Sequence, residues 1–250
     1  PIDIIGFDAC LMQMTEVAYQ IRNYATVMVG SEETIPGYGW PYHYILQNLT
    51  NTPYMGVSQF AQKIVGAYRD YYKSHSTIYY DGTIIPTTRL TLSAVSLTQI
   101  NALSMTLNNF ALRLIDKYSV LRDELMRCRN LAQEFMTGEL VEPWYYVDLY
   151  NFTQLVYSDE DISDTEVKIS ARNLMEIINK TVIFEWHDLG RYKYLRYFPR
   201  GKEETEWFLG CPGSHGLSIY FPKNSTHYHS SYSQLDISTE SCFYWNVFLK

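Results

Sequence analysis

The first thirty residues change their hydrophobic period twice, and this pattern restricts the chain to a small group of folds. Residues 2–7 form a nearly continuous apolar run, as expected for a strand buried on both faces of a parallel sheet. From Leu11 onward the apolar residues recur with helical spacing, and residues 26–30 have the pattern of a second strand. A strand, a helix and a strand in so short a span predict a βαβ unit with a right-handed crossover and two parallel strands.

This unit brings chemically active side chains to one edge of the predicted sheet. Asp8 and Cys10 follow the first strand directly, and Ser31, Glu32 and Glu33 follow the second. In open α/β sheets, ligands bind in the crevice beyond the carboxyl ends of the strands. We therefore expect a thiol and several carboxylates around one crevice.

Cys10 has two interpretations on this pattern. A helix that begins directly after it would favour the thiolate, because the N-terminus of a helix carries partial positive charge, and this suits a nucleophile. A free cysteine is more often a small buried hydrophobic residue. Asp8 ends an otherwise apolar strand, where a carboxylate costs desolvation unless it is paired, although acidic residues are usually exposed. Spacing alone leaves these alternatives open.

Composition excludes several classes of protein. The hydrophobic fraction of 46% and the charged fraction of 19% are typical of a folded globular chain. A net charge of −7 argues against a nucleic-acid surface, and no apolar run reaches the length of a membrane span. No two of the four cysteines are spaced as Cys-x-x-Cys, so a zinc or redox motif is not expected.

The rest of the chain alternates between helical and extended patterns. We expect helices at residues 57–73, 97–118, 120–135, 146–156 and 165–179, and strands at 89–97, 182–186 and 217–221, with a short helix or extended tail at 244–249. Residues 34–42 form a loop rich in glycine, proline and aromatic residues, which suits the wall of a substrate pocket.

Residues 4–42, IIGFDACLMQMTEVAYQIRNYATVMVGSEETIPGYGWPY, resemble the clostripain family of cysteine peptidases, relatives of caspases, gingipains and legumain in fold. The likeness rests on the strand that ends in Asp8-Ala9-Cys10-Leu11-Met12, the helix at 16–19, the Gly30-Ser31-Glu32-Glu33 exit and the Gly-x-Gly-Trp-Pro-Tyr loop at 37–42. Further blocks at 91–95, 146–150 and 216–222 extend it over nearly the whole chain.

This resemblance implies an α/β fold, namely a caspase-like αβα sandwich with a mainly parallel sheet and extra C-terminal helices. Residues 1–97 would be the C-terminal part of the catalytic domain with the nucleophile, 98–180 a mostly helical region, and 181–250 closing strands packed on the same core. It also implies cleavage of peptide bonds after Arg or Lys, with Cys10 as nucleophile. Asp8, Ser31, Glu32 and Glu33 would then bind substrate, and which glutamate supplies the second pocket acid stays open.

Family members pair this cysteine with a histidine of an upstream His-Gly motif. No histidine precedes Cys10 here, so we expect an N-terminally truncated piece that is inactive alone and needs the missing part of its own protein; natural processing by internal cleavage would also explain a start at Pro1. His215-Gly216 has the same dipeptide, but it precedes a strand and follows the cysteine in the chain, and we do not expect it to be the general base. His43, His75, His187, His227 and His229 are expected to be surface or packing residues.

The resemblance further implies peptide or protein substrates with basic side chains and a secreted or cell-envelope location in a prokaryote. No metal or other cofactor is required for thiol chemistry. Calcium dependence is implied by the resemblance alone, because residues 158–164 lack the spacing of a calcium loop. The alternative is a non-catalytic scaffold that binds basic peptides or serves as a structural domain. A small-molecule hydrolase would explain Cys10 but not the other blocks.

Overall fold

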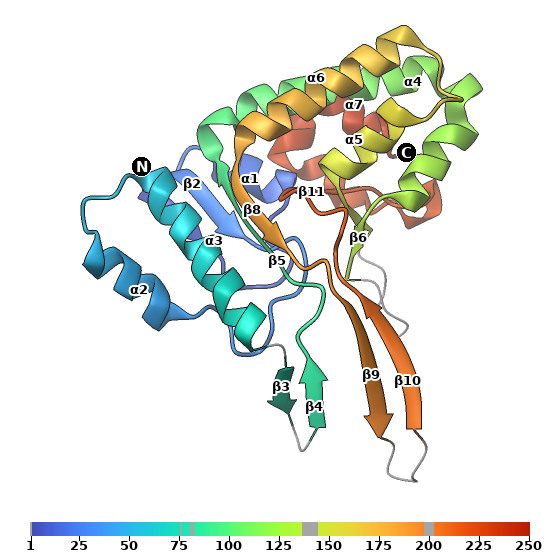
Figure 1. Ribbon diagram of the computed structural model, residues 1–250. Coiled ribbons are helices and arrows are strands. Elements are labelled where there is room, and N and C mark those ends of the chain that lie inside the picture. The colour runs from blue at the N-terminus through green and yellow to red at the C-terminus, as the bar shows by residue number, and fades with distance from the viewer. Residues whose placement is uncertain (1, 76, 81–82, 137–144, 198–202) are drawn as a thin grey trace.

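The computed structural model describes residues 2–75, 77–80, 83–136, 145–197 and 203–250 (Figure 1). Its centre is a four-stranded sheet in the order β1-β2-β5-β8. The strands are β1 (Ile2–Gly6), β2 (Ala25–Gly30), β5 (Thr91–Ser96) and β8 (Val182–His187). β1 pairs with β2 in parallel, whereas β2 with β5 and β5 with β8 are antiparallel. The α/β class and the first βαβ unit are confirmed, but the described sheet is mixed rather than mainly parallel.

The mixed pairing follows from the connection between β2 and β5. Between them the chain forms α2 (Tyr42–Asn51) and α3 (Val57–Ser74) and returns to the edge of the sheet where β2 ends. The Tyr72 hydroxyl near the end of α3 donates to the Gly39 carbonyl at that edge, over 2.8 Å. β5 therefore starts beside the end of β2 and must run in the opposite direction.

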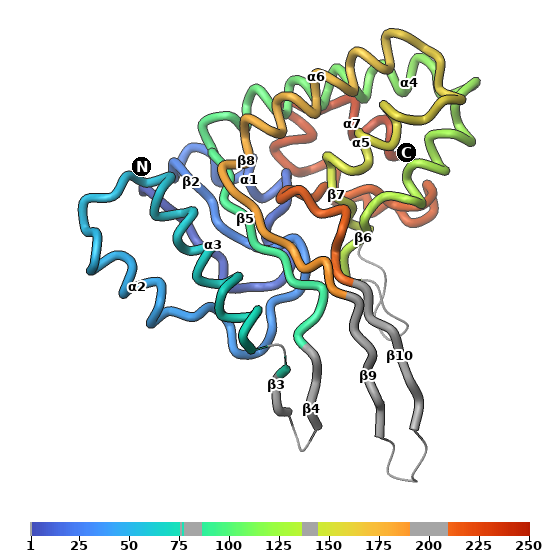
Figure 2. The backbone as a smooth tube through the Cα atoms, in the orientation of Figure 1, coloured from blue at the N-terminus to red at the C-terminus, as the bar shows by residue number. Residues whose placement is uncertain are grey.

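Helices cover both faces of the sheet (Figure 1). α3 packs on one face, and α2 packs against α3. On the other face lie α1 (Thr15–Ile21), α4 (Ile100–Leu131) and α6 (Thr165–Thr181), with α5 (Leu149–Ser158) and α7 (Phe243–Phe248) packed on α4. Figure 2 shows the C-terminal segment with α7 lying against α4. None of the described helices is long and apolar enough to cross a membrane.

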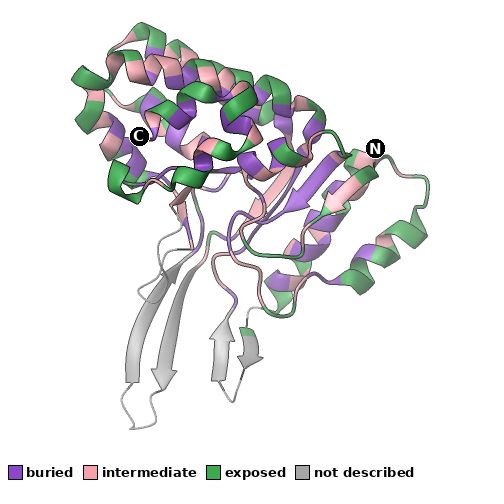
Figure 3. Ribbon diagram, turned by 180° about the vertical axis from the view of Figure 1, so that it is seen from behind, coloured by how far each residue is buried: buried purple, intermediate pink, exposed green. Residues whose placement is uncertain are grey.

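The two faces of the sheet carry separate hydrophobic clusters. In β2, Val27 and Val29 belong to the cluster under α3, whereas Met28 belongs to the cluster under α1 and α4. β5 alternates in the same way, with Ala94 on the first side and Val95 on the second. This period of two is what a strand buried on both faces requires. In Figure 3, strands at the centre of the molecule are coloured as buried.

Short strands connect the end of the chain to its beginning. β6 (Glu134–Phe135), β7 (Tyr146–Asp148) and β11 (Ser218–Tyr220) form a three-stranded sheet. The Ser218 N–H donates to the Gln13 carbonyl over 3.0 Å, which places β11 beside the segment before α1. Two hairpins complete the strands: β3 (Thr77–Tyr80) with β4 (Thr83–Pro86), and β9 (Arg191–Tyr197) with β10 (Glu203–Leu209).

Several expectations about individual elements are wrong. β1 is exposed to half-buried along its length rather than buried on both faces, because in the described sheet it is an edge strand. The helices expected at 97–118 and 120–135 are the single helix α4, which continues to Leu131. Residues 146–148 are strand β7 rather than the start of a helix. Of the two alternatives for 244–249, a short helix or an extended tail, the structure shows the short helix α7.

Candidate active site

Cys10 lies in a loop between β1 and α1. The expectation that a helix starts directly after it is wrong, because α1 begins at Thr15. In between, the Leu11 N–H donates to the Glu33 carbonyl and the Gln13 N–H to the Ser31 carbonyl, so the backbone follows the exit of β2 instead of coiling. Leu11 also has a positive φ of 58°. The positive end of a helix therefore does not act directly on Cys10.

The Cys10 thiol is open to solvent. Its Sγ accepts a hydrogen bond from the backbone N–H of Ile35 over 3.3 Å. The other three cysteines are free thiols as well, but they are buried, and their burial raises the pKa of each, that of Cys128 to about 12. A thiol needs access and thiolate character to act as a nucleophile. Among the cysteines of this chain, Cys10 is the one with access.

Asp8 lies next to the loop of glycine, proline and aromatic residues. Its Oδ2 accepts from the Trp40 N–H over 3.1 Å and from the Tyr42 hydroxyl over 3.0 Å. Gly39 has a φ of +65°, and a Cβ there would lie 2.7 Å from Oδ2, so the close approach requires glycine. Asp8 is exposed, so the desolvation expected for a carboxylate that ends an apolar strand does not apply.

Ser31 and Glu33 lie beneath this loop with their side chains engaged inside the protein. The Ser31 hydroxyl lies 2.8 Å from the Thr91 hydroxyl. The Glu33 carboxylate pairs with the Arg89 guanidinium at 2.8 Å and accepts the backbone N–H groups of Thr34 and Met136. Their backbones adjoin the Cys10 segment, as the sequence predicts, but their side chains do not line an open pocket in the part of the chain that the structure describes.

Glu32 belongs to a buried acid pair with Asp148. Its Oε2 accepts the Gly216 N–H over 3.1 Å. Burial raises the pKa of Glu32 well above its ordinary value, and the charge of Asp148 raises it further. Asp148 in turn accepts the N–H groups of Asn151 and His215, each over 2.6 Å. The sequence analysis does not include Asp148 in the site. The available signal is that an aspartate directly before a helix is a typical N-cap, and Asp148 caps α5.

His215 is held by residues other than Cys10. Its Nδ1 lies 3.3 Å from Oδ1 of Asp148, and its ring stacks on that of Tyr150 with centroids 4.4 Å apart. The burial of His215 lowers its pKa, but the hydrogen bond and charge of Asp148 outweigh this, and the pKa is raised. Among the described residues, no hydrogen bond joins any histidine to the Cys10 thiol.

The structure also places the acidic residues of the segment 158–164. Arg127 contacts both Asp159 and Asp161 at 2.7 Å, and Lys117 contacts Asp164 at 2.9 Å. Asp164 also caps α6 by accepting the Val167 N–H. No group of three or more metal-ligating side chains was found within the described ranges.

Sequence comparisons relate this chain to known proteins. The model of the clostripain family matches residues 1–250. Clostripain from Hathewaya histolytica is 24% identical over 268 residues, which cover 94% of this chain and 45% of that protein. The chain therefore spans less than half the length of this curated relative.

Solved structures show the same fold. A cysteine protease from B. fragilis is similar with a TM-score of 0.63 at 21% identity, covering 100% of this chain and 90% of its own. A secreted cysteine protease from Bacteroides thetaiotaomicron, solved with an irreversible peptide inhibitor, also gives 0.63 at 23% identity, covering 96% of this chain and 59% of its own. The caspase-like class expected from the sequence is thereby confirmed.

Proposed function

This chain belongs to the clostripain family, and on that premise we propose that it carries the nucleophile of a cysteine endopeptidase that cleaves peptide bonds after Arg or Lys. The observation that supports the proposal best is the exposure of Cys10, while the chain's other three thiols are buried. A second support is Asp8, an exposed carboxylate two residues before the thiol.

The chemistry follows from a thiolate. Cys10 Sγ attacks the carbonyl carbon of the substrate, the C–N bond breaks, and the amine leaves with a proton from an imidazolium. Water, deprotonated by the same imidazole, then cleaves the thioester and frees the thiolate and the acid. Each histidine of this chain has contacts elsewhere, so the proposal assigns this base to a histidine from outside these 250 residues.

Within the proposal, Asp8 selects the basic side chain. A carboxylate already oriented by Trp40 and Tyr42 accepts a charge-assisted hydrogen bond from a guanidinium or ammonium group. The buried side chains of Ser31, Glu32 and Glu33 would support the backbone segment that leads to Ile35. Direct contact of Glu33 with substrate would require it to leave Arg89, so Asp8 carries most of the selectivity.

Covalent labelling tests the assignment of Cys10. An Arg-directed, thiol-reactive peptide probe is applied to this chain and to the product of the complete gene, and mass spectrometry locates the adduct. We expect the adduct on Cys10, with faster labelling in the complete product. A folded complete product without an adduct on Cys10 would favour the non-catalytic scaffold that binds basic peptides.

Matched variants test the role of Asp8. Asp8→Asn should reduce the preference for an Arg probe over its neutral citrulline counterpart by about 10- to 100-fold, the value of one charged hydrogen bond. Gly39→Ala should have a similar effect because its Cβ would displace the Asp8 carboxylate. Gly37→Ala, with no atom within 4 Å of its Cβ, is the control and should keep the preference. Unchanged preference in Asp8→Asn would refute the role of Asp8.

The neighbours suggest where such an enzyme would act. The relative from Bacteroides thetaiotaomicron is described as secreted, and its complex contains a peptide inhibitor. By analogy, we propose peptide or protein substrates and secretion or attachment to the cell envelope. A fractionation experiment that found the protein in the cytoplasm alone would contradict this location.

A further inference from the structure

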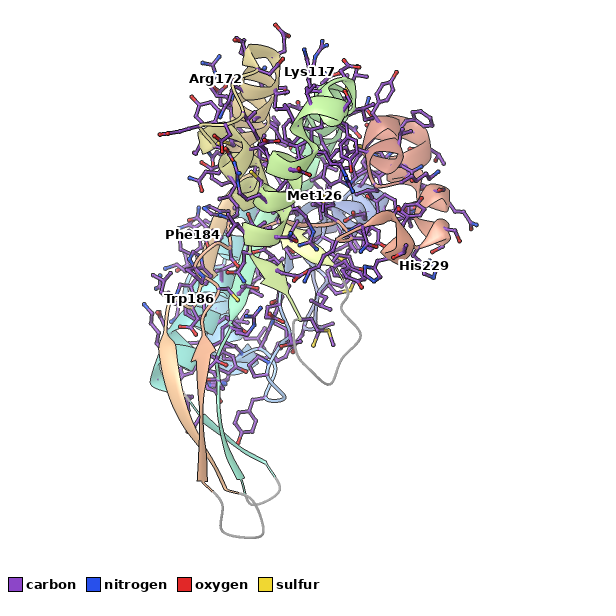
Figure 4. The ribbon with its side chains drawn as sticks, turned by 90° about the vertical axis from the view of Figure 1, so that its right-hand side faces the viewer. Lys117, Met126, Arg172, Phe184, Trp186 and His229 are labelled. Carbon is purple, nitrogen blue, oxygen red and sulfur yellow. The ribbon has the colours of Figure 1, made fainter. Side chains whose placement is uncertain are left out.

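A cavity of about 610 Å³ lies between the start of α1, strand β7 and the segment that follows β11. Five tyrosines, Tyr145, Tyr146, Tyr220, Tyr228 and Tyr232, contribute to its lining together with Glu16, and we call it the tyrosine pocket. His229, also in its lining, lies on the opposite side of the molecule from Phe184 and Trp186 of β8 in Figure 4. Its volume suits an amino-acid side chain or a small organic molecule.

Glu16 gives this pocket an unusual chemical property. The residue is only 7% exposed, and its Oε1 accepts from the Tyr220 N–H at 3.0 Å and the Tyr232 hydroxyl at 2.8 Å. Its Oε2 is buried without any hydrogen-bond partner. A buried carboxylate oxygen without a donor is costly, and burial accordingly raises the pKa of Glu16.

Within the described part of the chain, no ion pair includes Glu16. The lining of the pocket contains no lysine or arginine, and its two histidines have other contacts: the His227 ring stacks on Tyr145, and His229 Nδ1 lies 2.6 Å from the Ser231 hydroxyl. The aromatic surroundings attract positive charge as well, because the face of a tyrosine ring is negative. One of these rings already has such a contact: Lys250 Nζ, outside the lining, lies 5.6 Å from the Tyr228 ring centroid.

We propose that the tyrosine pocket binds an organic cation with N–H donors, such as the alkylguanidinium or alkylammonium end of a basic side chain. The positive end of the ligand would lie over the tyrosine rings and be attracted by the negative charge of the buried Glu16 carboxylate, and the rings would cover the alkyl part. A neutral polyol would leave this buried carboxylate without a counter-charge. The proposal does not depend on the role of Cys10.

Titration of the purified chain with n-butylguanidinium, followed by chemical shifts of ¹⁵N-labelled protein, tests this site. We expect saturable shifts in residues 226–235 with a Kd on the order of 1 mM, a usual value for so small a ligand. The neutral isostere n-butylurea should bind at least about tenfold more weakly, because it lacks the charge. Equal affinity for the two probes, or no saturable shift, would overturn the proposal.

Two variants separate the site from general effects on folding. Glu16→Gln should abolish the preference for the cation. Since this buried substitution could also unfold the chain, Ser231→Arg places a fixed positive charge at an exposed position of the lining, and Ser230→Arg places one beside it, outside the lining. Ser231→Arg should weaken binding about tenfold or more and Ser230→Arg should not. Equal affinity in these two variants would contradict binding in this pocket.

Discussion

Removing the guanidinium of Arg89 should destabilise the chain strongly, although Arg89 touches no substrate in the proposed mechanism. Arg89→Met leaves the Glu33 carboxylate, whose side chain is 3% exposed, without its counter-charge, and it removes the hydrogen bond to the Glu134 carbonyl. Breaking a buried pair from one side costs about 3–5 kcal/mol. Because Thr34 and Met136 still donate to Glu33, we expect the low end, a loss of about 3 kcal/mol in the free energy of unfolding.

Urea unfolding at pH 7, followed by tryptophan fluorescence and circular dichroism, measures this loss. Arg172→Met is the matched control, since Arg172 and Glu176 are 57% and 61% exposed and 4.0 Å apart, and it should change the free energy by less than about 0.5 kcal/mol. The double variant Glu33→Gln with Arg89→Met removes the unpaired charge and should recover at least about 1 kcal/mol. A loss below about 1 kcal/mol in Arg89→Met, or a double variant no more stable than it, would refute the reasoning.

Three further outcomes are expected in the same unfolding assay. Gly216→Ala should cost about 2 kcal/mol or more, because φ there is +94° and a Cβ would lie 2.9 Å from that of Ser93; a loss below about 0.5 kcal/mol would contradict this. Gly66→Ala, in α3 with open space around its Cβ, should instead stabilise by about 0.5–1 kcal/mol, and any loss would be the contrary result. The penalty of His215→Asn should shrink from pH 6 to pH 9. Asp148 raises the folded-state pKa of His215. The stabilisation by protonated His215 is therefore full below about pH 6.5 and is lost as the pH rises through the raised pKa. An equal penalty at pH 6 and pH 9 would exclude the interaction of His215 with Asp148 as its cause.

Helices with a clear apolar stripe were predictable from the sequence. The helix expected at 165–179 is α6, which begins at Thr165 because Asp164 caps it, and the helix expected at 57–73 is α3, which has no side-chain cap. The buried stripe is a local signal in both helices, and the cap adds to it in α6. The position of Cys10 and Asp8 at one edge was predictable for a similar reason, because both follow a strand.

Other elements depend on partners far away in the sequence. The start of α1 could not be predicted, because Gln13, in a helical pattern, donates its side-chain amide to the Ser93 carbonyl and stays outside the helix. The long helix α4 continues through Ser119, between the two helices expected there, and no glycine or proline interrupts it. The hairpin of β3 and β4 has a local signal in the sequence, because the dipeptide Asp81-Gly82 is typical of hairpin turns. The burial of Glu32 and Glu33 was not predictable, because their partners Gly216 and Arg89 lie far away in the sequence.

The hydrogen bonds from Ser218 to the Gln13 carbonyl have a consequence for the order of folding, because a ribosome makes the chain from its N-terminus. Three contacts of the first 32 residues, from Ser218 to Gln13, from Tyr220 to Glu16 and from Gly216 to Glu32, span 184 to 205 residues. Residues 216–220 must therefore be synthesised before the surroundings of Cys10 can reach the arrangement seen here. Such long separations between partners slow folding and lengthen the time for which incomplete chains expose apolar surface. The thiol would thus remain in an unfinished site while the residues between Glu32 and Gly216 are being made.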